Sequence, residues 1–148
     1  MTDTSTVLQV LVGLFLLLES ANVLALYFAP GSDKFNAVGV FDGWEDSKAD
    51  PDTHAFVSYL VFWVAGTKVI FIALWLVILL TAQPQTQFVA SLVMIPAIAT
   101  FYWRLFPIAR GLDDRGKVHP SGYSRVLGWM IAGFIIAFVV AIAFALWA

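Results

Sequence analysis

Long runs of apolar residues separated by short polar stretches dominate the chain. Four such runs cover about residues 7–28, 57–80, 88–108 and 126–147. Each has roughly the 20 residues that an α-helix needs to cross about 30 Å of hydrocarbon. Alternating segments of about ten residues, which are typical of membrane β-barrels, are not found. The pattern predicts an all-α, polytopic integral membrane protein in which residues 1–148 form one domain, a single bundle of four transmembrane helices.

Composition supports this class. Apolar residues make up 61% of the chain and charged residues 12%, whereas soluble domains average roughly half and a quarter. The chain has no cysteine, which excludes disulfides and thiolate chemistry by its own residues. No Lys or Arg precedes the first run, and this run carries Glu19 and Asn22. We therefore expect a retained helix rather than a cleaved signal.

The segment of residues 29–56 between the first two runs is long and acidic. Four of its apolar residues recur at every third position: Phe35, Val38, Phe41 and Trp44. This spacing predicts a short amphipathic helix lying on the membrane surface. Asp50 and Pro51 form a good N-cap and first-turn pair, so the second helix is expected to begin near Pro51.

The acidic residues of this segment do not have the spacing of a metal site. They do not match the calcium loop of an EF-hand, and no pair of histidines has zinc-binding spacing. His54 lies just before the second apolar run and His119 lies in the segment between the third and fourth runs, so neither is within a span, which argues against haem ligation. We expect no metal, no cofactor and no nucleic-acid partner, and we assign the acidic residues to solvation and helix capping.

Cations outside the apolar runs lie in two segments only. They are Lys34, Lys48, Arg110, Arg115, Lys117 and Arg125. The turn between the second and third runs and the two termini contain no Lys or Arg. By the positive-inside rule, residues 29–56 and 109–125 are predicted to be cytoplasmic and both termini outside, in a plasma or inner membrane.

Three charged residues, Glu19, Lys68 and Arg104, lie inside the apolar runs. A charge at this depth costs several kcal/mol unless it is paired or hydrated. At 1.5 Å per residue, Glu19 and Lys68 lie at depths that differ by only about 4 Å on consecutive helices. We expect a buried ion pair between them, with Asn22 on the same face as Glu19. Whether the pair only fixes packing or handles a proton or solute stays open.

Arg104 allows two interpretations. It lies about 6 Å from the cytoplasmic end of its run, so its long side chain can reach the headgroups. Alternatively it turns inward and joins Glu19, Asn22 and Lys68 in one intramembrane polar cluster. Pro96 and Pro107 predict a kink in this third helix.

The fourth run carries a stripe of small residues at every fourth position. Its members are Gly133, Ala137, Ala141 and Ala145. Membrane helices associate closely through such stripes, either within one chain or between subunits. The bulky Phe134, Phe138 and Phe144 occupy other faces and are expected to meet lipid.

No nucleophile with a neighbouring base and no phosphate-binding loop is found, so no catalytic residue is assigned. We expect a small, non-catalytic interaction or assembly subunit that associates with itself or another membrane protein through its helix faces. In this interpretation the Glu19–Lys68 pair is an internal anchor. The alternative is an oligomeric transporter or channel for a small solute or protons that uses the same polar cluster.

Overall fold

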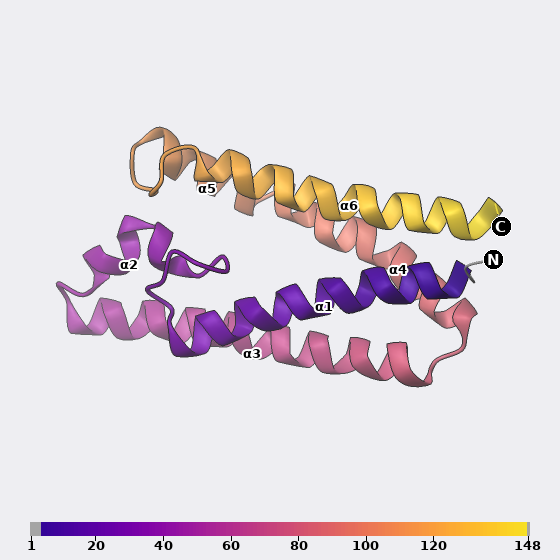
Figure 1. The fold of residues 1–148 in the computed structure, drawn as a ribbon. Coiled ribbons are helices and arrows are strands. Elements are labelled where there is room, and N and C mark those ends of the chain that lie inside the picture. The colour runs from indigo at the N-terminus through magenta and orange to yellow at the C-terminus, as the bar shows by residue number, and fades with distance from the viewer. Residues whose placement is uncertain (1–3, 148) are drawn as a thin grey trace.

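The computed structural model describes residues 4–147, and most of this part of the chain is helical (Figure 1). Its long helices are α1 (Thr4–Phe28), α3 (Pro51–Thr81), α4 (Pro84–Ala99), α5 (Leu105–Asp114) and α6 (Tyr123–Trp147). The short elements are η1 (Val38–Val40), α2 (Asp42–Ser47) and η2 (Thr100–Tyr102). Within this described part there is no strand, which confirms the all-α prediction. Four helical stretches are long and apolar enough to cross a membrane: 6–28, 51–81, 84–114 and 123–147.

The long helices lie side by side, and both chain ends are at the same end of the molecule (Figure 1). Helix α1 packs along α3 and α6, and α6 packs along α4 and α5. The two longer loops, residues 29–50 and 115–122, lie at the opposite end.

Phe15 of α1 is at the centre of the main core. Its ring makes edge contacts with Phe71, Phe134 and Phe138, at centroid distances of 6.2, 5.1 and 5.7 Å. Phe138 is only 1% exposed. The prediction that Phe138 meets lipid is therefore wrong, because its face of α6 packs against α1.

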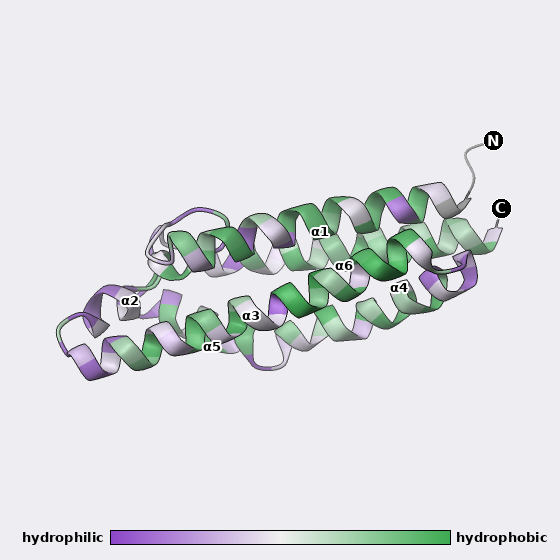
Figure 2. Ribbon diagram, turned by 90° about the horizontal axis from the view of Figure 1, so that it is seen from below, coloured by the Kyte–Doolittle hydropathy of each residue, from purple (hydrophilic) through white to green (hydrophobic). Residues whose placement is uncertain are grey.

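The long helices are largely apolar along their length (Figure 2), and many of their apolar side chains are exposed. On α3, for example, Leu74 and Val77 are 60% and 58% exposed. Exposed apolar surface of this extent is unusual for a soluble monomer.

The loop after α1 does not form the predicted amphipathic helix. Phe35 and Asn36 have positive φ angles of 52° and 56°, and Phe41 is extended. These conformations interrupt any continuous helix. Trp44 is buried against Leu26 and Val61 instead of facing outward. The regular spacing of these apolar residues therefore reflects packing within the chain and not a surface helix.

Gly39 is required where this loop doubles back on itself. A Cβ at position 39 would lie 2.1 Å from the carbonyl oxygen of Gly31. Gly39→Ala is therefore expected to destabilise the protein by at least about 1 kcal/mol. Gly43→Ala is the matched control, since a Cβ at Gly43 in α2 meets open space and alanine favours a helix by up to about 1 kcal/mol. Chemical unfolding of both variants tests this, and equal stabilities would contradict it.

Asp50 caps α3, as the sequence predicts. Its carboxylate accepts hydrogen bonds from the backbone N–H groups of Asp52 and Thr53, each at 3.3 Å. The hydrogen bond from the Thr53 hydroxyl, followed by that from the Asp52 amide, holds the pKa of Asp50 below its usual value. Helix α3 thus begins at Pro51.

The third apolar run is two helices, not one kinked helix. Helix α4 contains Pro96 and ends at Ala99, and the chain passes through η2 and a turn before α5 begins. Pro107 lies in the first turn of α5, where a missing N–H costs no helical hydrogen bond. The predicted kink is thus a break at residues 100–104.

Candidate functional site

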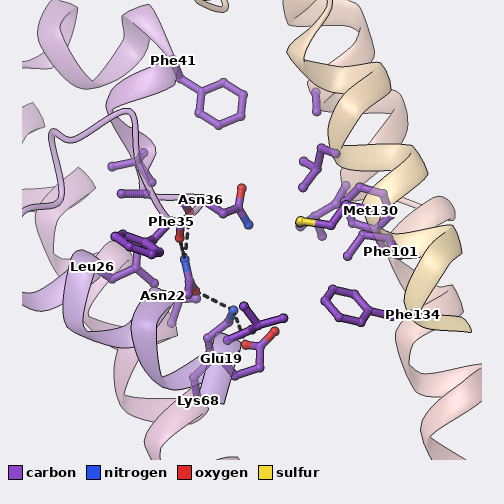
Figure 3. Close-up of a pocket in the computed structure, with 18 of the residues that line it drawn as sticks. Glu19, Asn22, Leu26, Phe35, Asn36, Phe41, Lys68, Phe101, Met130 and Phe134 are labelled. Carbon is purple, nitrogen blue, oxygen red and sulfur yellow. Dashed lines mark hydrogen bonds and ion pairs between the residues drawn. The ribbon is translucent and has the colours of Figure 1, made fainter. Parts of the chain in front are cut away.

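Glu19 of α1 and Lys68 of α3 form an ion pair (Figure 3). The Lys68 ammonium lies 2.7 Å from Oε2 of Glu19 and 2.7 Å from Oδ1 of Asn22. The Lys68 and Glu19 side chains remain 29% and 21% exposed. The sequence predicted a buried pair, but this pair is partly exposed, because both side chains line a cavity.

Asn22 joins this pair to the loop that follows α1. Its amide nitrogen donates to the carbonyl oxygens of Phe35 and Asn36, the latter at 2.9 Å. Carbonyls only accept and an ammonium only donates, so the orientation of the Asn22 amide is fixed by its partners. Asn22 thus links α1, α3 and the loop. Residues 35 and 36 lacked any sequence signal for this role.

A cavity of about 590 Å³ opens beside the ion pair and is partly open to the surface. Glu19, Asn22 and Lys68 lie on one wall, and Phe101, Met130 and Phe134 face them from the opposite wall (Figure 3). Most of the lining is apolar. A largely apolar cavity of this size with a few convergent polar groups is typical of a small-molecule site.

No protein-family model, curated protein or solved structure matches this chain. Its function has to be inferred from the cavity and its polar wall.

The two loops at the cavity end of the molecule are joined by a short clasp, Val40–Asp42 with Lys117–His119. Phe41 and Val118 form an isolated antiparallel bridge. The Asp42 amide donates to the Lys117 carbonyl at 3.1 Å, and the His119 amide donates to the Val40 carbonyl at 2.8 Å.

Side chains add to this clasp. The Asp42 carboxylate lies 3.1 Å from Nε2 of His119 and 3.5 Å from the Lys117 ammonium. Phe41, at the centre of the clasp, also lines the cavity. The clasp therefore ties one edge of the cavity to the loop that leads into α6.

A disulfide across the clasp is expected to form and to stabilise the protein. In this bridge the flanking residues make the backbone hydrogen bonds, so the Cα atoms of Phe41 and Val118 are expected about 4.5 Å apart, within disulfide range. Phe41→Cys with Val118→Cys should raise the free energy of unfolding by roughly 2–4 kcal/mol on oxidation. Thermal unfolding with and without reductant measures this gain.

The natural chain contains no cysteine, so no other thiol competes. Phe41→Cys with Lys117→Cys is the control, because neighbouring residues of an extended strand point to opposite faces. If the control pair cross-links as readily as the test pair, the two loops do not hold this register.

Arg104 does not join the polar cluster. It lies at the break before α5, is exposed, and is not among the residues that line the cavity. Its guanidinium lies 5.3 Å from the ring centre of Trp103. Among residues 4–147, the ion pair and hydrogen bonds of Glu19 involve Lys68 and not Arg104.

The residues of the small-residue stripe on α6 differ in how deeply they are buried. Ala141 is buried within the chain, and Ala137 and Ala145 are half-buried. Gly133 is exposed, and a Cβ at that position would meet no atom within 4 Å. The stripe thus packs inside the protein around Ala141 and turns outward at Gly133.

Gln87 is a buried polar residue that the sequence interpretation missed. Its amide nitrogen donates to the carbonyls of Leu79 and Ala82 at 3.1 and 3.2 Å, and its oxygen accepts from Gln9 at 3.0 Å. The carbonyls at the end of a helix have no helical partner. A polar side chain soon after the end of α3 was therefore the sequence signal that could have predicted this role of Gln87.

Within residues 4–147, no group of three or more His, Cys, Asp or Glu residues has a metal-binding arrangement. The ion pair, the Asn22 amide and the apolar lining of the cavity offer charge pairing, hydrogen bonding and apolar contact.

Proposed function

We propose that this chain is an integral membrane protein whose α1, α3, α4–α5 and α6 segments cross the bilayer as one bundle. Their length and their exposed apolar faces support this proposal. The cations near the loop end favour a cytoplasmic position for that end, with both termini outside.

Its proposed activity is the non-catalytic binding of a small, largely apolar molecule in the cavity. The observation that carries this proposal is one polar wall of Glu19, Asn22 and Lys68 facing an apolar wall across about 590 Å³. Binding is favoured over conduction because the core cluster around Phe15 fills the space toward the termini. The polar pair Gln9–Gln87 lies nearer the termini. On α1, Val12, Phe15 and Leu16 of the apolar cluster lie between Gln9 and Glu19, so this pair does not continue the polar wall.

Native mass spectrometry of the protein extracted gently from its own membranes tests this function. The wild type is expected to carry a ligand mass that the Ile131→Trp variant loses, since Ile131 lines the cavity and an indole would occupy it. Ile136→Trp is the matched control, because Ile136 lies on the same helix, is 59% exposed and is not part of the lining. An identical ligand mass on all three proteins would contradict the proposal.

A second candidate is an assembly subunit that associates with itself or another membrane protein. Gly133 favours it, because its open surface on α6 lets another helix approach closely. Gly133→Leu is expected to release a partner or dissociate an oligomer in the same mass spectra. Unchanged stoichiometry would argue against this surface.

A further inference from the structure

We propose that the cavity selects an uncharged amphiphile, a molecule with an apolar body and one neutral hydrogen-bonding head such as a hydroxyl. Glu19, Lys68 and Asn36 would recognise the head. This inference rests on the proposed binding function and adds the chemical class of the ligand.

The polar wall has hydrogen-bonding capacity left on three groups. Two partners take up two of the three N–H donors of Lys68. Within residues 4–147, no side chain or backbone group donates to Oε1 of Glu19. Asn36 accepts from the Tyr123 hydroxyl through its oxygen at 2.9 Å, and its amide nitrogen is turned toward the cavity in Figure 3. The wall can thus accept one hydrogen bond and donate others.

The charge of this wall favours a neutral head. Glu19 and Lys68 already neutralise each other at 2.7 Å, and the residues on the opposite wall are apolar. A head with its own net charge would lose hydration without gaining an uncompensated partner, which is unfavourable in a low-dielectric site. A hydroxyl can donate to Glu19 while it accepts from Lys68 or Asn36.

The opposite wall suits an apolar body. Phe101, Met130 and Phe134 face the ion pair across the cavity (Figure 3). Aromatic rings and a flexible thioether adapt to apolar ligands of varied shape. Head and body therefore meet different walls, which is the arrangement an amphiphile requires.

The test uses three photoreactive dodecyl probes that differ only in the head. One ends in a hydroxyl, one in a sulfonate and one in a trimethylammonium group, and each carries a diazirine in the middle of the chain. The full-length protein in lipid nanodiscs is irradiated with each probe, and labelled residues are mapped by peptide mass spectrometry. Labelling of Phe101, Met130 and Phe134 reports occupation of the cavity.

The hydroxyl probe is expected to label these residues at least about tenfold more than either charged probe, a difference of roughly one decade in affinity. Ile131→Trp should abolish this labelling, and Ile136→Trp should preserve it. Equal or stronger cavity labelling by a charged probe would overturn the neutral-head inference but leave the binding function intact. Absence of cavity labelling by any probe, in wild type and both variants, would overturn both.

A charge variant tests recognition separately from packing. In Glu19→Gln the wall gains a net positive charge, so the preference should shift toward the sulfonate probe. A merely structural role for Glu19 would lower labelling by all probes equally and would overturn the assignment of Glu19 to the head. If this variant does not fold, the wild-type ratio among the three probes still decides the inference.

Discussion

Asn22→Ala is expected to destabilise the protein by about 2–3 kcal/mol, the largest effect of any single side chain at the site. Asn22 is only 7% exposed. Its loss removes an acceptor from the Lys68 ammonium and a donor shared by the Phe35 and Asn36 carbonyls. Hydrogen bonds to charged groups contribute more than neutral ones. Chemical unfolding in a fixed detergent measures the change.

Ser20→Ala is the matched control for this substitution. Ser20 lies on the same helix, and its hydroxyl donates only to the Leu16 carbonyl one turn earlier. Such a local bond contributes little to tertiary stability. A loss in Asn22→Ala no larger than in Ser20→Ala would show that the link between α1, α3 and the loop is not formed.

Removing one member of the ion pair is expected to cost about 1–3 kcal/mol in Glu19→Gln or Lys68→Met. Each single variant leaves a half-buried charge without its opposite charge. The double variant leaves neither charge, so it should be less destabilised than the sum of the two single variants. A double-mutant cycle from unfolding measurements is expected to give a coupling of about 0.5–3 kcal/mol.

Exchanging the two charges should restore only part of this stability. The carboxylate introduced at position 68 would face Oδ1 of Asn22, an acceptor whose orientation is set by the loop carbonyls. Full recovery in Glu19→Lys with Lys68→Glu would contradict this orientation. A coupling near zero in the double-mutant cycle would contradict the ion pair itself.

The helices were predictable because the properties that define them are local. About 20 consecutive apolar residues have few alternatives to a helix long enough to cross a membrane. The Asp50–Pro51 start of α3 was predictable for the same reason, since an N-cap bonds only the residues that follow it. The contact between Glu19 and Lys68 followed from similar depths on consecutive helices.

Other expectations failed where distant segments decide the outcome. Trp44 was expected on a surface helix, yet it packs against α1 and α3. For Arg104 the sequence left two positions open, and the structure places it at the break at residues 100–104, outside the cavity lining. Phe138 was expected to face lipid, because a sequence pattern does not say which face of α6 meets α1.

The sequence by itself determined the helical class, the four long apolar segments, the cap of α3 and two partners of the polar cluster. Each depends on spacing along one helix or between two consecutive helices. Only the tertiary structure decided the cavity, the link from Asn22 to the loop and the clasp between Phe41 and Val118. These features join residues far apart in the chain, and their formation depends on how whole helices pack, which no local pattern encodes.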